Sequence, residues 1–308
     1  MPSTVVGRYD KGKGKGKGKG KGKGKGNVMK FLRFGTPGSE KPALIDTDGT
    51  LRDLSGEIAD LSGAMLDPMK LTELAKLDTN LLPAVSGNPR LGPPVAGTGK
   101  FICIGLNYSD HAAETGAIVP PEPIIFMKAT SAICGPNDAV HIPRGSTKTD
   151  WEVELGVVIG RTAKYVTEAE APGYVAGYCT VHDVSERAFQ IEHEGQWTKG
   201  KSADTFGPIG PWLVTPDDVP NPQNLPMWLT VNGKKMQDGS TNTMIYSVAF
   251  LVSYLSRFMS LQPGDIISTG TPPGVGMGMS PPRYLAPGDK VELEVEGLGR
   301  QQQTITQD

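Results

Sequence analysis

The sequence has few of the features that mark secreted, redox or membrane proteins. It contains three cysteines, Cys103, Cys134 and Cys179, at wide spacings and with no C-x-x-C pair. Each is therefore expected to be a buried, reduced side chain rather than half of a disulfide or a metal ligand, which favours a cytoplasmic location. No apolar run approaches the roughly 20 residues of a membrane span, and the N-terminus has no apolar stretch of the signal-peptide kind.

A large excess of charge is also absent, because the formal net charge is only −2. This total hides an asymmetry, since residues 1–28 carry +8 and the rest of the chain therefore carries −10. An acidic body argues against a nucleic-acid partner. A small anionic substrate would then need local positive groups inside its site.

Glycine and proline, by contrast, are abundant, with 40 and 26 residues, which predicts many turns and short strands. Residues 11–26 are eight Lys-Gly repeats, which cannot bury apolar surface. We interpret residues 1–28 as a disordered extension ahead of Met29 rather than as a polyanion-binding arm. The remaining predicted units are a small N-terminal domain at 29–78, a linker at 79–99 and a catalytic domain at 100–308.

The predicted strands do not alternate regularly with helices, which excludes a doubly wound parallel sheet. The expected class is α+β, mostly β. A helix capped by Ser247 is expected to run to Leu261, and residues 62–77 contain a helical stretch. Strands are predicted at 29–34, 43–46, 50–54, 100–105, 124–128, 151–160, 181–183, 228–231, 233–237, 266–269 and 291–295.

Two glutamates stand at the start of an apolar segment that reads as a strand. Glu152 and Glu154 are two residues apart, so they point to the same face. Two like charges side by side are unfavourable unless a cation lies between them or water surrounds them. Oxygen ligands suit Mg²⁺, Mn²⁺ or Ca²⁺ better than zinc. Asp183, at the end of another strand, is a third candidate ligand; the alternatives are an exposed strand edge and a helix-capping aspartate.

A possible general base lies after the strand at 100–105. If residues 107–114 are helical, His111 and Glu114 are neighbours three residues apart, and the carboxylate would make the far imidazole nitrogen a better base. The alternative is an incidental pair on a surface helix. We expect residues 107–121 to form a lid, because this stretch is polar and ends in Pro120-Pro121.

A glycine-rich loop, Thr269–Gly276, follows another predicted strand. It lacks a GK[ST] ending, and its prolines prevent it from opening a helix as a phosphate-binding loop does. It is expected to be a rigid backbone surface for a small ligand.

In combination these motifs resemble the fumarylacetoacetate hydrolase family. The resemblance covers roughly residues 100–300. Its motifs are G-x-N-Y-x-x-H-x-x-E at 105–114, F-x-K at 126–128, E-x-E-L at 152–155, H-D at 182–183, K-x-x-D-T-F-x-P-x-G-P at 201–211 and P-G-D-x-I-x-T-G-T-P-x-G-V-G at 263–276.

This resemblance implies a mixed β-roll fold, with residues 29–78 as the small N-terminal domain that many members carry, and usually a homodimer. It implies Mg²⁺ or Mn²⁺ on Glu152, Glu154 and Asp183. His111 would be the base for water, Glu114 would orient it, and Lys201 would stabilise developing negative charge.

The expected reaction is C–C bond hydrolysis in a small 2,4-diketo acid. The segment 276–285 resembles the branch that acts on 2,4-diketo-3-deoxy sugar acids derived from L-rhamnonate or L-fuconate, giving pyruvate and a hydroxy acid. Acylpyruvate or fumarylpyruvate hydrolase, oxaloacetate decarboxylase and ureidoglycolate lyase-like activities remain alternatives, and a non-catalytic binding module is a remote one. The predicted substrate-binding residues are Tyr108, Lys128, Arg187, Gln190 and Thr271; for Arg187 and Gln190 a helix-surface pair is the alternative.

Overall fold

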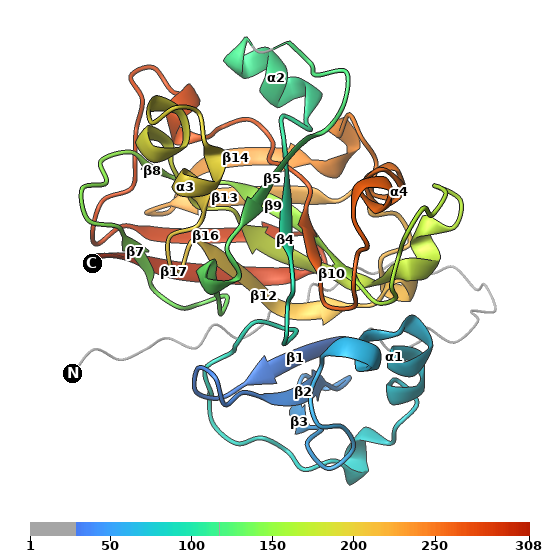
Figure 1. Ribbon diagram of the computed structural model, residues 1–308. Coiled ribbons are helices and arrows are strands. Elements are labelled where there is room, and N and C mark those ends of the chain that lie inside the picture. The colour runs from blue at the N-terminus through green and yellow to red at the C-terminus, as the bar shows by residue number, and fades with distance from the viewer. Residues whose placement is uncertain (1–28, 117) are drawn as a thin grey trace, which may run out of the picture.

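The computed structural model describes residues 29–116 and 118–308, so the predicted extension at 1–28 lies outside the described residues. It contains three sheets and few helices, as Figure 1 shows, which confirms the α+β, mostly β class. The four α-helices are short: α1 (Pro68–Leu74), α2 (Ser109–Thr115), α3 (Trp197–Lys201) and α4 (Val248–Phe258).

The largest sheet has ten strands and contains the strands that carry the acidic motifs. Its order is β3 (Leu51–Asp53), β2 (Lys41–Ile45), β1 (Lys30–Phe34), β12 (Gly207–Val214), β10 (Val175–His182), β9 (Val153–Ile159), β15 (Ile266–Ser268), β4 (Phe101–Gly105) and β5 (Ile124–Lys128), with β6 (Ile133–Cys134) paired to β12.

A second sheet of five strands and a two-stranded ribbon complete the β-structure. The five strands follow the order β14 (Lys234–Ser240), β13 (Pro226–Val231), β16 (Lys290–Val295), β17 (Gly299–Gln307) and β7 (Val140–Ile142). The ribbon pairs β11 (Ser185–Glu186) with β8 (Thr149–Asp150). Each predicted strand overlaps an observed one, but β6, β7, β8, β11, β12 and β17 were not predicted.

The N-terminal unit is continuous with the main sheet. Strand β1 pairs antiparallel with β12, with Phe31 opposite Leu213, and both side chains are fully buried. The predicted linker at 79–99 runs along this unit, where the backbone N–H of Gly92 donates to the carbonyl of Arg33 at 2.8 Å. In Figure 1 the unit lies below the rest of the chain, and β1 and β12 face each other across that boundary.

Local sequence explains where the helices begin and end. Ser247 accepts a hydrogen bond from the backbone N–H of Phe250 and so caps α4, as predicted, although the helix ends at Phe258 rather than at Leu261. The helical stretch at 62–77 is divided into a 3₁₀ turn and α1, because Pro68 opens α1 behind the capping carboxylate of Asp67.

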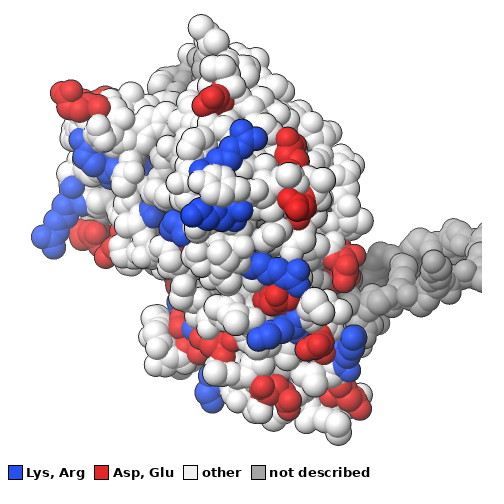
Figure 2. All heavy atoms as spheres, turned by 45° about the vertical axis from the view of Figure 1, so that its right-hand side comes forward, with Lys and Arg blue, Asp and Glu red and all other residues white. Residues whose placement is uncertain are grey.

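None of the helices in the described part of the chain is both long and apolar enough to cross a membrane. On the face drawn in Figure 2, lysine and arginine side chains lie among aspartate and glutamate side chains rather than in a patch of one sign. The three cysteines are free thiols, with Cys103 and Cys179 buried.

Candidate active site

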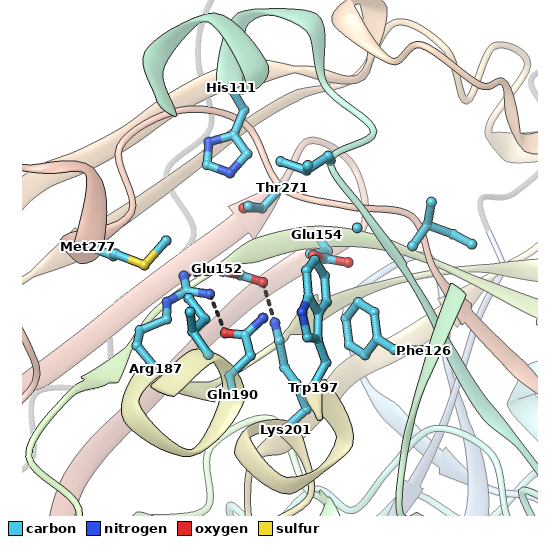
Figure 3. Close-up of a pocket in the computed structure, with 14 residues that line it drawn as sticks. His111, Phe126, Glu152, Glu154, Arg187, Gln190, Trp197, Lys201, Thr271 and Met277 are labelled. Carbon is cyan, nitrogen blue, oxygen red and sulfur yellow. Dashed lines mark hydrogen bonds and ion pairs between the residues drawn. The ribbon is translucent and has the colours of Figure 1, made fainter. Parts of the chain in front are cut away.

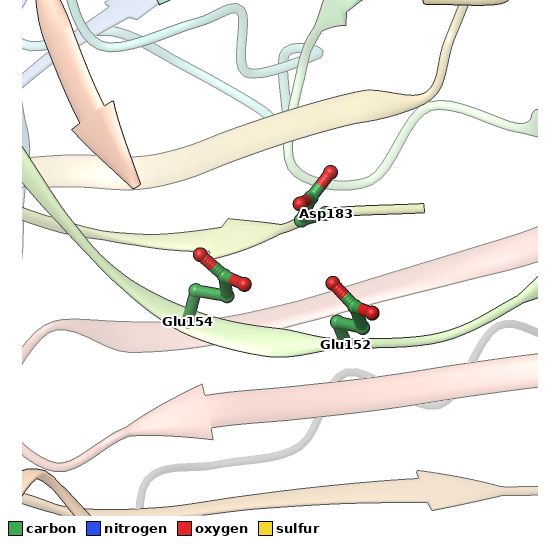
Figure 4. Close-up of side chains that lie close together, drawn as sticks. All are labelled: Glu152, Glu154 and Asp183. Atoms are coloured by element: carbon green, nitrogen blue, oxygen red, sulfur yellow. The ribbon is translucent and has the colours of Figure 1, made fainter. Parts of the chain in front are cut away.

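Three carboxylates meet where two neighbouring strands of the main sheet begin and end. Strands β9 and β10 run antiparallel, with Glu154 opposite Val181, so Glu152 at the start of one strand lies near Asp183 at the end of the other. One oxygen from each of Glu152, Glu154 and Asp183 lies within 4.8 Å of the other two, and all three residues are buried. Figure 4 shows their carboxylates turned toward one shared space.

Positive side chains surround two of these carboxylates. Lys201 Nζ lies 2.7 Å from Glu152 Oε2 and 2.7 Å from Asp183 Oδ2. Lys128 Nζ contacts Asp183 Oδ1 at 2.5 Å, and Arg187 Nη2 lies 2.7 Å from Glu152 Oε1. Within the described residues, Glu154 is the member of the three that makes no ion pair.

Glu154 instead accepts hydrogen bonds from uncharged groups where β15 joins the glycine-rich loop. Its Oε2 accepts from the Ser268 hydroxyl at 2.5 Å and from the backbone N–H of Gly270 at 2.9 Å. Gly270 has a φ of 96°, a left-handed conformation that favours glycine. The glycine therefore lets the chain turn so that its N–H faces the carboxylate.

Because their partners differ, the pKa values of Glu152 and Glu154 are shifted in opposite directions. Burial opposes ionisation of Glu152, but the charges of Lys201 and Arg187 outweigh it and hold the pKa of that carboxyl well below its usual range. Burial raises the pKa of Glu154 well above its usual range, and the negative charges of Asp183 and Glu152 raise it further. Glu154 is thus the carboxylate that a further cation would stabilise most.

The arrangement fits a divalent metal ion. All three donors are carboxylates, which suits Mg²⁺ or Mn²⁺. A cation shared by Glu152, Glu154 and Asp183 would relieve the repulsion that raises the Glu154 pKa. The geometry therefore agrees with the predicted ligand set.

The predicted base lies on α2, across the cavity from the carboxylates. His111 Nδ1 is 3.1 Å from Glu114 Oε2, one helical turn further on. Glu114 is held in turn by the backbone N–H of Gly274, at 3.0 Å from Oε1 and 3.2 Å from Oε2. In Figure 3 the imidazole of His111 points from its helix toward Thr271 and the glutamates below.

A cavity of about 220 Å³ lies between this helix and the carboxylates. Its walls combine charged, polar and apolar side chains, many of which are drawn in Figure 3. The lining residues are Ile104, Gly105, Leu106, His111, Phe126, Glu152, Glu154, Arg187, Gln190, Ile191, Trp197, Lys201, Thr271 and Met277.

Residues 100–308 match a known family along almost their whole length. The family described as "Fumarylacetoacetate (FAA) hydrolase C-terminal" matches residues 100–306. The chain belongs to the fumarylacetoacetate hydrolase family. A relative from Burkholderia multivorans, whose name describes it only as a hydrolase, is 61% identical over 276 residues, which cover 89% of this chain and 98% of the relative.

Solved structures of the same fold include both hydrolases and an isomerase. The fumarylacetoacetate hydrolase of Exiguobacterium antarcticum has a TM-score of 0.81 at 34% identity and covers 91% of this chain and 100% of its own. The 5-carboxymethyl-2-hydroxymuconate delta-isomerase of Mycobacterium smegmatis has 0.71 at 31%, with 91% and 99% covered. The maleylpyruvate hydrolase of Sphingobium sp. SYK-6, in complex with manganese(II) and pyruvate, has 0.75 at 26%, with 91% and 99% covered.

Three of the five predicted substrate-binding residues of this family member line the cavity. Arg187 and Gln190 lie side by side, with Arg187 Nη1 donating to Gln190 Oε1 at 3.0 Å, and both are buried rather than on a helix surface. Their segment is a π-helical turn, Ala188–Glu192. Thr271 also lines the cavity, and its hydroxyl donates to the carbonyl of Val153 at 2.9 Å.

The other two residues lie away from the cavity surface, so the structure does not agree with their predicted role. Tyr108 is fully buried, and its hydroxyl contacts the Met227 sulfur at 3.4 Å. Lys128 lies behind Asp183 and donates to the carbonyl of Val184 at 2.9 Å. Tyr108 is therefore a core residue, and Lys128 positions and neutralises a carboxylate.

Seven residues that line the cavity were not identified from the sequence as site residues, and Ile104, Gly105 and Leu106 are three of them. Phe126, Ile191, Trp197 and Met277 line the cavity, and Trp197 packs edge-to-face on Phe126 at a centroid distance of 5.2 Å. One signal was present, because Trp197 is four residues before Lys201 and so shares its helix face.

Asp150 was also missed, although it organises one side of the site. Its carboxylate accepts hydrogen bonds from the Arg187 Nε at 2.9 Å and from the backbone N–H groups of Gly276 at 2.7 Å and Met277 at 2.9 Å. It thereby ties Arg187 to the loop that carries Met277. One signal was present, because Asp150 is two residues before Glu152 and so shares the face of Glu152 and Glu154 if the strand extends to it.

Proposed function

We propose that this protein is a divalent-metal-dependent hydrolase that cleaves a C–C bond in a small 2,4-diketo acid, giving pyruvate and a second carboxylic acid. One observation carries the proposal: His111, which pairs with Glu114, lines the same cavity as Glu152 and Glu154, which form a buried carboxylate cluster with Asp183. A fumarylacetoacetate hydrolase and a maleylpyruvate hydrolase of the same fold support this reaction class.

The metal supplies one part of the chemistry. A Mg²⁺ or Mn²⁺ ion held by Glu152, Glu154 and Asp183 would polarise the carbonyl oxygens of the diketo acid and offset the negative charge that develops as the bond breaks. Lys201 Nζ lies 2.7 Å from Glu152 and from Asp183, so it adds a positive charge beside the carboxylates.

The proton transfers are assigned to His111. Glu114 on Nδ1 favours the tautomer that leaves Nε2 as the proton acceptor. Nε2 takes a proton from water as the water oxygen attacks C4 of the substrate. The C3–C4 bond then breaks, C4 leaves as the new carboxylic acid, and the electron pair of the bond passes to the C2–C3 unit as an enolate. The imidazolium of His111 returns its proton to C3, which gives pyruvate and restores the neutral base. Arg187 and Gln190 would orient a carboxylate or carbonyl oxygen at one end of the substrate.

The segment 276–285 supports a sugar-derived substrate of the L-rhamnonate or L-fuconate type, since Met277 within it lines the cavity. Acylpyruvate hydrolysis, decarboxylation and lyase action use the same site chemistry, and enol–keto isomerisation is favoured by the isomerase of the same fold. A homodimer is the expected assembly.

The decisive experiment is incubation with a panel of diketo acids and Mn²⁺ or Mg²⁺ in H₂¹⁸O, with products identified by mass. Hydrolysis places ¹⁸O in the new carboxylate beside pyruvate. Release of CO₂ without a second acid would indicate decarboxylation, and a product of unchanged mass would indicate isomerisation. Either result across the whole panel, with no hydrolysis, would contradict the proposal.

A further inference from the structure

The two sides of the cavity differ in chemistry. Arg187 and Gln190 lie on one side, and Trp197 and Phe126 lie on the other (Figure 3). The indole of Trp197 meets the Phe126 ring at 61°, which gives an edge-to-face aromatic wall. The wall is thus a defined, largely apolar surface rather than a polar subsite.

Gly105 makes room for this wall. A Cβ at position 105 would lie 2.5 Å from Trp197 Cζ3, which is closer than any side chain tolerates. Ile104, the preceding residue of β4, also lines the cavity. The strand therefore presents an apolar side chain and a glycine where the indole approaches, and it contributes no polar side chain there.

The positive charges of the cavity are already paired with carboxylates of the protein. Of the described residues that line the cavity, Arg187 and Lys201 carry a permanent positive charge. Arg187 contacts Asp150, Glu152 and Gln190, as described above. Lys201 lies 5.0 Å from the Phe126 ring centroid, but its ammonium is held between Glu152 and Asp183.

A ligand carboxylate placed against Trp197 would therefore lose its hydration without gaining a counter-charge. An alkyl or methyl end placed there would instead be removed from water against two aromatic rings, which is favourable. The cavity consequently distinguishes the two ends of a substrate: one polar end at Arg187 and Gln190, and one uncharged end at the aromatic wall.

We propose that Trp197 and Phe126 are specificity-determining residues that select 2-oxo acids whose far end is uncharged and apolar, and that they disfavour substrates with a second carboxylate there. This rests on the proposed function in taking the ligand to be a 2-oxo acid. Methyl-ended diketo acids, including the acyl ends derived from 6-deoxy sugar acids, fit this selection, whereas maleyl- or fumaryl-type acyl groups do not.

The test uses two ligands that the enzyme cannot cleave between C3 and C4, namely 2-oxohexanoate and 2-oxoadipate. They have six carbons each and differ only in a terminal methyl against a terminal carboxylate. Binding to the full chain with saturating Mn²⁺ is measured by titration calorimetry. Wild type should bind 2-oxohexanoate at least about tenfold more tightly, the scale on which pockets separate such substrates.

Three substitutions of Trp197, which is partly exposed on α3, sharpen the result. Trp197→Phe should keep the preference for 2-oxohexanoate over 2-oxoadipate, and Trp197→Gln should weaken it. Trp197→Arg should reduce or reverse the ratio of the two affinities, because the guanidinium supplies a counter-charge for the terminal carboxylate. Circular dichroism and melting temperature identify any variant that is not folded. The wild-type comparison of the two ligands needs no variant and decides the inference even if the substitutions destabilise the protein.

Tighter or equal binding of 2-oxoadipate by wild type would overturn this inference while leaving C–C hydrolysis intact. Preferential binding of 2-oxohexanoate would support it even if no diketo acid in the panel were hydrolysed, in which case the proposed reaction alone would be wrong. A preference unchanged in both Trp197→Gln and Trp197→Arg would show that other residues set it, and would also contradict the assignment.

Discussion

The floor and the roof of the cavity are built in contrasting ways. Glu152, Glu154 and Asp183 are almost fully buried at strand ends and are held by short contacts to Lys201, Lys128 and the loop after β15. The roof is α2, a seven-residue helix whose Glu114 side chain is 26% exposed. A site divided in this way can keep its charges fixed while the base is carried by a less stable element.

The largest effect is expected from changing the floor. Asp183→Asn should reduce metal-dependent turnover to the background rate and weaken Mn²⁺ binding, because one of three charged ligands is lost. Calorimetry and a pyruvate assay measure the two effects. Glu186→Gln is a matched control, since Glu186 is a buried carboxylate outside the cluster of Glu152, Glu154 and Asp183. Normal Mn²⁺ affinity in Asp183→Asn would remove this residue from the ligand set.

Changing the roof should separate catalysis from metal binding. His111→Ala is expected to lower kcat by about 10²–10⁴, the usual contribution of a general base, with Mn²⁺ affinity unchanged. Ser109→Ala, an exposed position on the same helix, is the control and should keep kcat within about twofold of wild type. Near-normal kcat in His111→Ala would assign the proton transfer to another group.

Hydrogen exchange should show the same contrast without any substitution. We expect the amides of residues 108–116 to exchange at least about tenfold faster than those of β9 in the ligand-free protein, because short helices are marginal unless packed. Adding Mn²⁺ with pyruvate should slow amide exchange in the helix and leave the exchange rates of β9 unchanged. Equal protection of the two segments before ligand is added would show that the roof is as rigid as the floor.

The two glutamates of the floor allow a pH test. The raised pKa of Glu154 means that its ionisation destabilises the folded chain as pH rises above the ordinary value of 4.5, whereas Glu152, with its lowered pKa, contributes stability that persists there and is lost only at lower pH. Mn²⁺ offsets the cost of ionising Glu154, so at a fixed Mn²⁺ concentration the rise in Tm that it causes should grow with pH. The rise should reach about 5 °C where that concentration is 100 times Kd.

Glu154→Gln should remove this pH dependence, since no proton then competes with the metal at that position. Thermal melts at several pH values, with and without Mn²⁺, measure it. An unchanged dependence in the variant would place the competing proton on a different group.

The smallest effect is expected from deleting residues 1–28. The described cavity and all three sheets are formed by residues after Met29, and a Lys-Gly repeat has no apolar surface to bury. Therefore kcat should stay within about twofold and Tm within about 2 °C of the full chain. A large loss of either would show that the extension contributes to the working protein.

Local patterns predicted most of the strands because their buried positions are apolar. Strand β17 was missed for the opposite reason, since Gln301 and Gln303 occupy two of its inward positions. Their amides bond to the carbonyl of Thr180 at 2.8 Å and to that of Pro136 at 2.5 Å, contacts far apart in sequence. A buried glutamine is stable only where such partners exist, and no single segment reveals them.

The sequence by itself determined the acidic pair Glu152–Glu154, because alternation along a strand places both on one face, and it determined the short-range pair His111–Glu114 on one helix. Its place at the end of a predicted strand made Asp183 a candidate third ligand, and the family resemblance added Lys201. Only the tertiary structure decided which partners give the two glutamates different pKa values. It also placed Tyr108 and Lys128 away from the cavity and brought Trp197 and Phe126 together as an aromatic wall. The physical reason is that burial and charge pairing arise from residues tens of positions apart, which meet only when β4, β9, β10 and α3 are packed together.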